Sequence, residues 1–328
     1  MPDTALTVVP EGSGDVPRAA TRDGFGRGVV EAGKKDERVV VLCADLAEST
    51  RAEWFQKEFP KRYIELGVAE QNLAAVGAGF AEYGKIPFIT SYAAFNPGRN
   101  NEQIRTTIAL NNVPVKICGM HAGVSVGPDG ATHQALEDIG LMRMLPHMVV
   151  IQPIDAEEAR KATLAAAENG RPTYLRFTRE KSPIVTTAAT PFSIGTAYAL
   201  YETESPQIAI IGCGPVLTEA LLAARELSAR GIRTTVINMH TIKPLDAEYL
   251  YRTALSHRGI VTVEEHQAAG GLGSAVAEFL AAHHPMPIEF VAVHDRFGQS
   301  GTVSELYREY GLDRTAIMDA VARCMKRS

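Results

Sequence analysis

The chain has 328 residues, of which 45% are hydrophobic and 22% are charged, and its formal net charge is −5. This length suits about two domains of roughly 150 residues each, and the composition is ordinary for a globular protein with a sizeable core. Lys and Arg are spread along the whole chain, which argues against a nucleic-acid partner or an anionic membrane surface. No apolar run approaches the ~20 residues that a membrane helix needs.

The segment 1–17 contains Pro, Gly and Asp but no apolar stretch of the kind found in signal peptides. We therefore expect it to be a flexible N-terminal segment. The four cysteines lie far apart and form no C-x-x-C pair, which predicts reduced, buried thiols in a cytoplasmic protein.

A first α/β domain is expected over 18–185, where helices alternate with strands. The strands are continuous apolar runs typical of buried parallel sheets, and we place them at 39–46, 86–92, 113–120, 148–153 and 172–177. The accompanying helices are expected at 22–35, 71–83, 99–111, 135–144 and 156–169, the last of which begins after an N-cap at Asp155. This alternation predicts an open, doubly wound, mostly parallel sheet.

A segment rich in Thr, Ser and Pro follows the first domain, and we place a linker at 186–196. The second domain, 197–328, repeats the architecture. Strands are expected at 207–214, within 233–246, at the start of 259–283 and at 287–293, and helices at 217–230, at the end of 259–283 and at 313–326. The predicted fold class is therefore α/β with two open, mostly parallel, doubly wound sheets.

An unusual acid lies in the stretch "ELGVAEQN", residues 65–72. Glu70 follows a strand-like segment and opens a helix-like one. Its apolar neighbours, which include Val68, Ala69 and Leu73, are expected to be buried. A carboxylate in such surroundings loses hydration and is costly unless it has a partner, yet no counter-charge is visible nearby in the sequence.

The loop "HAGVSVGPDGATH", residues 121–133, follows a predicted strand and so lies where open α/β sheets bind ligands. His121, Asp129 and His133 are candidates for a functional site because they lie in a loop on a rigid scaffold. Two alternatives stay open at this point, a metal site formed by the same three residues and an ordinary polar surface loop.

Three further features have more ordinary interpretations. The glycine-rich turns 212–216 and 270–274 lack the full dinucleotide fingerprint, and close strand-to-helix packing explains them at least as well as a phosphate site. Tyr92 and Phe95 follow a strand, where core packing is the ordinary role of aromatic residues. Four arginines near predicted element ends would form an anion site if they converge; they are Arg22, Arg99, Arg176 and Arg179.

Four stretches taken together resemble the transketolase family, specifically the pyrimidine-binding and C-terminal domains of its members. They are "GVAEQN", "TSYAAFNPGRNNEQIR", the run from "HAGVSVGPDGATH" to "VVIQPIDAEE", and "LRFTRE". The G-D-G motif with which the family's N-terminal domain holds diphosphate and metal is absent. The resemblance implies the second, C-terminal subunit of a split transketolase, which transfers a two-carbon ketol unit from a ketose phosphate to an aldose phosphate together with a companion chain.

The resemblance implies thiamine diphosphate as the cofactor, with a divalent metal (Mg²⁺ or Ca²⁺) held by the companion chain and no metal ligand on this one. It also implies that Glu70 is catalytic and hydrogen-bonds N1′ of the cofactor's aminopyrimidine, since a carboxyl group in a dry pocket can share a proton with a ring nitrogen. Phe95, with Tyr92 nearby, matches the aromatic site that stacks on this ring. Asp45 matches an acid close to the cofactor.

The substrate residues follow from the same resemblance. His133 matches a catalytic histidine that contacts the hydroxyl groups of the donor, and Asp129 matches a residue that reads the C2 hydroxyl of an aldose acceptor. The group that grips the sugar phosphate is matched by Arg22, Ser49, His121 and Arg179. Arg99 receives no role, because its segment is one residue longer than in many relatives.

The resemblance further implies a homodimer of this chain flanked by two companion subunits, hence a heterotetramer. One alternative is a chain like a deoxyxylulose-phosphate synthase or the β subunit of a 2-oxoacid dehydrogenase; His121 argues against it, because in transketolases this residue recognises phosphate. The other alternative is a non-catalytic regulatory partner. Such a chain is expected to lose Glu70 first, because an unpaired buried carboxylate only costs stability.

Overall fold

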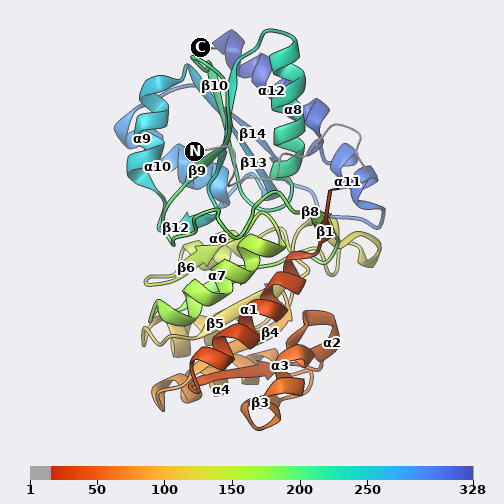
Figure 1. Cartoon of the computed structure of the whole chain (residues 1–328), viewed down its shortest axis with the longest axis vertical. Helices are drawn as coiled ribbons and strands as arrows, with labels where there is room; N and C mark the ends of the chain where they lie inside the picture. Colours follow the sequence, from red (N-terminus) through yellow and green to blue (C-terminus); the bar gives the residue numbers. More distant parts are fainter. Residues whose placement is uncertain (1–15, 328) are drawn as a thin grey trace.

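The computed structural model describes residues 16–327, in which two sheets are stacked end to end along the long axis of the molecule (Figure 1). Residues 1–15 of the segment expected to be flexible lie outside the described residues. The first half of the chain forms the lower part of the view and the second half the upper part. Both parts are α/β layers, as the alternation of apolar runs predicts.

The first sheet has seven strands in the order β12-β6-β7-β5-β4-β2-β3, and every neighbouring pair is parallel except β12 with β6. Its strands are β2 (Val39–Cys43), β3 (Tyr63–Glu65), β4 (Ile86–Tyr92), β5 (Lys116–Met120), β6 (Val149–Ile151), β7 (Thr173–Arg176) and β12 (Thr241–Lys243). A separate antiparallel pair, β1 (Arg18–Ala19) with β8 (Ser182–Pro183), ties the start of this half to its end.

Helices cover both faces of this sheet. The helices α1 (Thr21–Lys35) and α7 (Ala156–Glu168) lie together on one face, and α4 (Glu70–Glu82) packs on the other. At Gly24 a Cβ atom would lie 2.1 Å from the carbonyl oxygen of Ala156, so the glycine lets α1 approach α7 closely. The remaining segments of this half are α2 (Ala47–Thr50), α3 (Ala52–Glu58), η2 (Pro60–Arg62), α5 (Asn101–Gln103), the π-helix η3 (Ile104–Ala109), η4 (Val124–Asp129) and α6 (Asp138–Arg143).

Several predicted boundaries were wrong. The strand expected at 39–46 ends at Cys43, because Asp45 turns into the left-handed region with φ 59°. The helix expected at 135–144 begins only at Asp138. The helix expected at 99–111 is the short α5 followed by a π-helix. The helices α2 and α3 at 47–58 were not predicted, because they bury little apolar surface besides Ala52 and Phe55.

The second sheet has five strands in the order β14-β13-β10-β11-β9, all parallel except the pair β11 and β9. Its strands are β9 (Tyr198–Glu202), β10 (Ile208–Gly212), β11 (Thr234–Asn238), β13 (Gly259–Gln267) and β14 (Ile288–Val293). Its helices are α8 (Leu217–Ala229) and α12 (Arg314–Arg327) on one face, α9 (Ala247–Ser256) and α10 (Leu272–His283) on the other, and the short α11 (Val303–Glu309).

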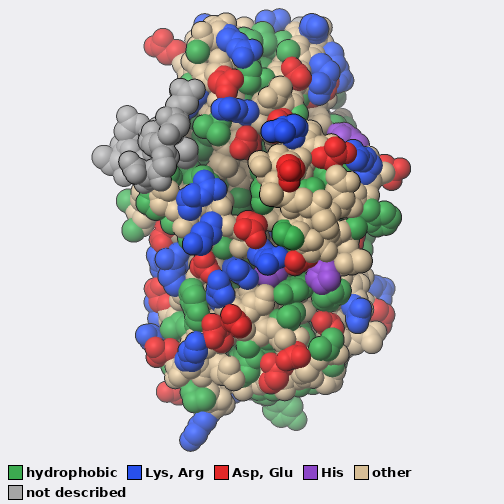
Figure 2. Space-filling model, turned by 90° about the vertical axis from the view of Figure 1, so that its right-hand side faces the viewer, with side chains coloured by type: hydrophobic (Ala, Val, Ile, Leu, Met, Phe, Trp, Pro, Cys, Tyr) green, Lys and Arg blue, Asp and Glu red, His purple; other side chains and the backbone are tan. Residues whose placement is uncertain are grey.

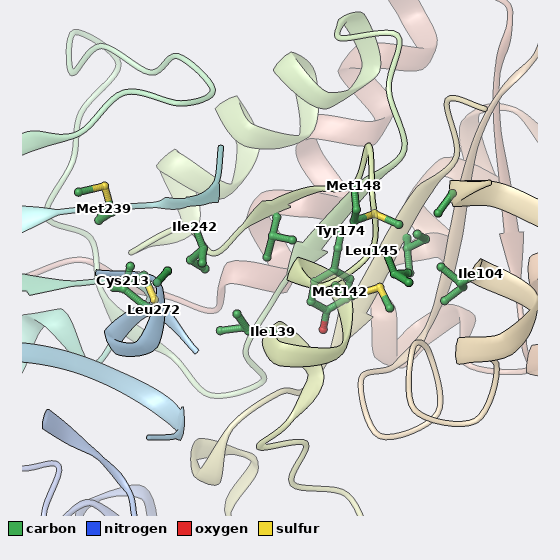
Figure 3. Packing of buried hydrophobic residues seen from close by; sticks show 14 of the residues in the cluster. Ile104, Ile139, Met142, Leu145, Met148, Tyr174, Cys213, Met239, Ile242 and Leu272 are labelled. Atoms are coloured by element: carbon green, nitrogen blue, oxygen red, sulfur yellow. The ribbon is translucent and has the colours of Figure 1, made fainter. Parts of the chain in front are cut away.

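The two halves share structure, which the sequence analysis did not anticipate. The segment 233–246, expected to be one strand and a loop, contains two strands, and the second of them, β12, pairs with β6 of the first sheet. One apolar cluster spans both halves, with Ile139 and Met142 from the first and Met239 and Leu272 from the second (Figure 3). Since each fully buried side chain of this kind contributes about 1.5–3 kcal/mol, this cluster joins the halves firmly.

A buried ion pair lies beside the shared cluster. Arg176 at the end of β7 donates through Nε to Asp138 Oδ2 at 2.7 Å and through Nη2 to Oδ1 at 3.0 Å. The same Nη2 group also donates to the carbonyl oxygens of Ala135 and of Glu265, which belongs to the second half. The guanidinium therefore links both domains in a site without solvent.

All four cysteines are free and buried, as predicted. Over residues 16–327, no helix is both long and apolar enough to cross a membrane.

Candidate active site

The candidate residues of the first domain converge at the carboxyl ends of its parallel strands. Asp45 and Ser49 follow β2, Tyr92 ends β4, and His121 follows β5. Because the first turns after parallel strands meet at one edge of a sheet, residues far apart in the sequence become neighbours here. The contacts described next show which of them actually touch.

Glu70 is the first residue of α4 and only 2% exposed. Its Oε1 atom accepts a hydrogen bond from the Ser91 hydroxyl at 3.0 Å, whereas its Oε2 atom is buried and has no partner in the described chain. Val68, expected to be buried with it, is 72% exposed because it lies in the turn that precedes α4. One carboxylate oxygen is therefore held by the protein and the other is left for a donor from outside.

A buried amide network holds the start of α4. Asn100 donates to the carbonyl oxygen of Glu70 at 2.9 Å and to Asn96 Oδ1 at 2.9 Å. Asn96 in turn donates to the carbonyl oxygens of Ile89 and Cys118. Sequence reasoning missed Ser91, Asn96 and Asn100. The two asparagines could have been recognised as candidates because they are spaced four residues apart directly after a predicted strand.

Four rings from the segments that follow β4 and β5 form a continuous aromatic wall. Tyr92 stacks on His121 with ring centroids 4.3 Å apart, and it lies 6.2 Å from Phe95 with nearly parallel planes. His133 meets the edge of this group, 5.5 Å from Phe95 and 5.9 Å from Tyr92. Both rings are only partly buried. Tyr92 packs against the core of the first domain, as the ordinary interpretation expects, but its hydroxyl also lies beside Ser49.

Arg22, Ser49 and His121 form a connected polar cluster. The Nη1 group of Arg22 donates to the carbonyl oxygen of Ser49 at 2.8 Å and to His121 Nε2 at 3.1 Å, and the Ser49 hydroxyl is 2.8 Å from the Tyr92 hydroxyl. Because arginine can only donate, His121 Nε2 must accept and its proton resides on Nδ1. This Nδ1 atom and Arg22 Nε are both buried and have no partner among the described residues.

The electrostatics of this cluster favour an anion. Burial lowers the pKa of His121 to about 3, and the charges of Arg22 and Arg179 add to the effect. Burial likewise lowers the pKa of Arg22, and the positive charge of Arg51 lowers it further. Uncompensated positive charge together with unpartnered N–H donors is what binds a phosphate or a similar oxyanion. On the side of the molecule drawn in Figure 2, blue Lys and Arg side chains lie next to purple His side chains near the middle, with red Asp and Glu side chains among them.

Arg179 reaches the same region from the segment after β7, and it pairs with Asp129 through Nη1 and Oδ1 at 2.7 Å. Both side chains are about one-third exposed, at 33% and 29%. Such a pair is held weakly enough for a ligand to rearrange it. The pair brings the predicted acceptor residue and one of the predicted phosphate residues into direct contact.

Asp45 is exposed and lies in a turn organised by Glu65, which sequence reasoning missed. The Oε1 atom of Glu65 accepts from the backbone N–H of Asp45 at 2.7 Å and from that of Gly67 at 2.9 Å, and Tyr63 donates to its Oε2. Glu65 thus couples the turn that carries Asp45 to the turn that leads into Glu70.

Two of the four arginines do not join the anion cluster. Arg176 is buried in its pair with Asp138, and Arg99 lies over the Phe95 ring at 5.3 Å. The metal alternative for the 121–133 loop finds no support, because residues 16–327 contain no group of three or more His, Cys, Asp or Glu side chains able to hold an ion.

The glycine-rich turns have packing roles. At Gly273 a Cβ atom would lie 2.6 Å from the Phe290 ring, and at Gly214, whose φ is +73°, it would lie 2.2 Å from Gln152 Nε2. These glycines permit close approach of helix to strand and of one domain to the other.

Comparison with known proteins identifies two domain families in the chain. Residues 18–184 match the transketolase pyrimidine-binding domain, and residues 197–317 match the transketolase C-terminal domain. The two matches together span most of the described chain, in the order that the motifs predict.

Two relatives match almost end to end. A protein described as a transketolase C-terminal section from Methanocaldococcus jannaschii is 41% identical over 309 residues, which are 93% of this chain and 96% of the relative. A 6-deoxy-6-sulfo-D-fructose transketolase subunit from a Clostridium species is 36% identical over 306 residues, 93% of this chain and 94% of the relative. A solved structure described as a split-gene transketolase, inactive β4 tetramer, superposes with a TM-score of 0.87 at 41% identity, covering 94% of this chain and 99% of its own.

Proposed function

Because this chain belongs to the transketolase family, whose pyrimidine-binding and C-terminal domains it contains, we propose that it is one subunit of a split transketolase. The proposed complex uses thiamine diphosphate to transfer a two-carbon ketol unit from a ketose phosphate to an aldose phosphate. The observation that carries the proposal is the unpartnered, buried Oε2 atom of Glu70 in a domain that also presents an aromatic wall and a basic cluster.

The residues fit the pyrimidine end of thiamine diphosphate. A buried carboxylate oxygen without a donor costs roughly 1–3 kcal/mol, and Glu70 Oε2 would accept the missing hydrogen bond from a proton-bearing ring nitrogen of the cofactor. Phe95 and Tyr92 offer partly buried ring faces for stacking, and the Glu65 turn presents Asp45 nearby. The chemistry that the cofactor supplies when bound is a nucleophilic ring carbon; Glu70 holds or releases the proton at the ring nitrogen, and the rings fix the orientation.

The residues proposed to bind the sugar phosphate fall into two groups, one for the terminal anion and one for the hydroxyl groups. The terminal anion of the substrate is bound by buried donors of Arg22 and His121 and by the partly exposed side chains of Ser49 and Arg179. His133 lies against the Phe95 and Tyr92 rings, Asp129 is paired with Arg179, and both contact the sugar hydroxyls in this proposal. Binding the distant anion orients the reacting carbon, which is how remote binding energy raises the rate.

A companion chain completes the site in this proposal, because the described chain has side chains for the pyrimidine and the sugar but no metal cluster. We place the diphosphate and its divalent metal on that companion. Two copies of this chain and two companions form a heterotetramer. The similarity to a split-gene transketolase described as an inactive β4 tetramer supports the need for a second kind of chain.

Co-purification of this chain with its companion, followed by a ketol-transfer assay, tests the proposal. The donor is xylulose 5-phosphate, offered with several aldose phosphates, and a parallel arm uses a sulfonated ketose because one relative is described as a sulfofructose transketolase subunit. We expect transfer only in the complex, and loss of transfer in Glu70→Ala. Full activity of the isolated chain would contradict the split-enzyme proposal, and undiminished transfer by Glu70→Ala would contradict the role of the acid.

A further inference from the structure

We propose that Glu265, on strand β13 of the second domain, is a positioning residue that anchors the 121–134 loop and thereby presents Asp129 and His133 to the sugar. The kinetic part of this inference rests on the proposed function. The structural part, that a carboxylate of the second domain holds a loop of the first, does not. It gives the second domain a role in positioning candidate residues that belong to the first domain.

The 121–134 loop has little regular structure of its own. It turns through positive φ at His121 (57°), Gly123 (85°), Gly127 (77°) and Gly130 (74°), and the only helical segment in it is the six-residue η4. A glycine-rich segment of this kind loses much conformational entropy when it is ordered. Contacts from outside the loop must offset that cost.

Glu265 supplies the strongest of these contacts. Its side chain is fully buried, and its Oε2 atom accepts a hydrogen bond from the backbone N–H of Ser125 at 3.0 Å. Its Oε1 atom accepts from the hydroxyl of Tyr307 on α11 at 2.6 Å, so the carboxylate is fixed from the other side by its own domain. Hydrogen bonds to a charged acceptor are about twice as strong as neutral ones.

The loop is shaped to receive this carboxylate. At Gly123 a Cβ atom would lie 2.5 Å from Glu265 Oε2, so any larger residue there would displace either the loop or the acid. Gly123 also donates its N–H to the carbonyl oxygen of Ala135, which closes the base of the loop. Close approach at Gly123 and the hydrogen bond at Ser125 are independent observations of the same anchoring.

A second contact from the same domain holds the other end of the loop. Gln134 donates from Nε2 to the carbonyl oxygens of Val124 and Gln299, both at 3.0 Å. A Cβ atom at Gly298 would lie 1.7 Å from Gln134 Oε1, which shows how tightly the 298–301 segment covers the loop. None of these contacts involves Glu70 or Phe95. Loss of the anchor should therefore affect the sugar residues most, because Glu70 is held by Ser91 and Asn100 from outside the loop. In the described chain, Phe95 and Tyr92 meet the loop only through ring contacts with His133 and His121.

Peptide-level hydrogen exchange on the full-length isolated chain tests the structural part. We expect Glu265→Met to speed exchange in 122–134 by about tenfold or more, with exchange in β2 and β4 unchanged. The matched control is Glu264→Met: Glu264 is the adjacent residue on β13, equally buried, and its carboxylate accepts from the N–H groups of Leu272 and Gly273 on α10. That variant should speed exchange at the start of α10 and leave 122–134 as in the wild type.

Two results overturn the inference: unchanged exchange of 122–134 in Glu265→Met, or an equal increase in both variants. If Glu265→Met does not fold, the variant Tyr307→Phe provides the test, because it removes the hydroxyl that holds the Glu265 carboxylate and keeps the ring. Hydrogen exchange in peptides 122–134 should then rise by a smaller factor than in Glu265→Met. Unchanged exchange in these peptides would overturn the inference.

In the reconstituted complex, Glu265→Met should lower kcat/KM for the aldose phosphate by about tenfold while the Kd of thiamine diphosphate changes by less than about twofold. An equal loss in cofactor affinity would mean a general structural role and would also overturn the inference. Absence of ketol transfer in the wild-type complex would instead refute the proposed function, and the exchange result would stand by itself.

Discussion

Removal of Asp138 should destabilise the protein strongly, because it leaves the Arg176 charge buried without its ion-pair partner. The two side chains are 1% and 0% exposed and share two short hydrogen bonds. In Asp138→Ala, Arg176 keeps only the carbonyl oxygens of Ala135 and Glu265 as acceptors, and the Tyr174 hydroxyl loses its acceptor as well.

The expected cost follows from measured losses at comparable pairs. Breaking a buried ion pair by removing one partner costs about 3–5 kcal/mol. At roughly 2–4 °C per kcal/mol for domains of this size, the thermal midpoint should fall by roughly 6–20 °C. The double variant Asp138→Leu with Arg176→Met removes both charges and keeps the volume, so it should recover more than about half of that loss.

The same pair predicts a pH dependence with a definite sign. Burial by itself would raise the pKa of Asp138, but the Arg176 guanidinium outweighs burial and holds that pKa below its ordinary value of 3.8. A carboxyl whose folded-state pKa is depressed contributes stability above its unfolded-state pKa, and this contribution is lost as the pH falls through the folded-state value. The difference in midpoint between wild type and Asp138→Ala should therefore be full above about pH 5 and shrink below about pH 4.

Thermal unfolding of the wild type, of the single variants Asp138→Ala and Arg176→Met, and of the double variant across this pH range provides the measurement. A loss below about 1 kcal/mol for Asp138→Ala would refute the reasoning, as would a double variant no more stable than either single one.

Three further outcomes concern the proposed site. Arg22→Leu should raise the KM for a phosphorylated ketose by about 10–100-fold, since hydrogen bonds between charged groups contribute about 1.5–3 kcal/mol; an equal rise for the same ketose without its phosphate would contradict the anion role. Phe95→Ala should weaken thiamine diphosphate binding by about tenfold, measured by titration of the complex, and unchanged affinity would remove the stacking role. Since burial lowers the pKa of His121 to about 3, the residue is neutral over the range from about pH 5.5 to 8. His121→Asn should therefore leave the pH profile of the donor KM over this range unchanged, and loss of a step near pH 6.5 would contradict this assignment.

The apolar runs predicted most of the sheet, because buried parallel strands are nearly continuous in Val, Ile and Leu. β2 and β4 show this plainly, since nearly all their residues are buried. Strand ends were less predictable, as the turn at Asp45 shows, because its conformation is set by Glu65, which lies 20 residues away. The pairing of β12 with β6 could not be predicted from the three residues of β12, since edge pairing depends on where the rest of the chain leaves room.

The candidate site was predicted through ordered motifs, and their residues do converge around Tyr92 and His121. The motifs did not predict which residue each side chain contacts through a hydrogen bond or an ion pair. Arg22 and Arg176 looked alike as arginines near element ends, yet Arg176 is paired with the carboxylate of Asp138. Arg22 instead donates to the neutral acceptors Ser49 O and His121 Nε2. Only the three-dimensional contacts separate a binding arginine from a structural one.

The sharing of a strand and a core between the two halves has a consequence for the covalent chain. Ala188 and Ala189 are exposed in the segment between the domains and offer a protease a cleavage point. A nick there would cut the backbone and release neither half, since β12 would stay paired with β6 and would still shield that edge from other strands. The nicked protein would thus show two fragments on a denaturing gel and would still elute at its intact size under native conditions. The masses of the fragments would therefore not reveal whether the two halves have dissociated.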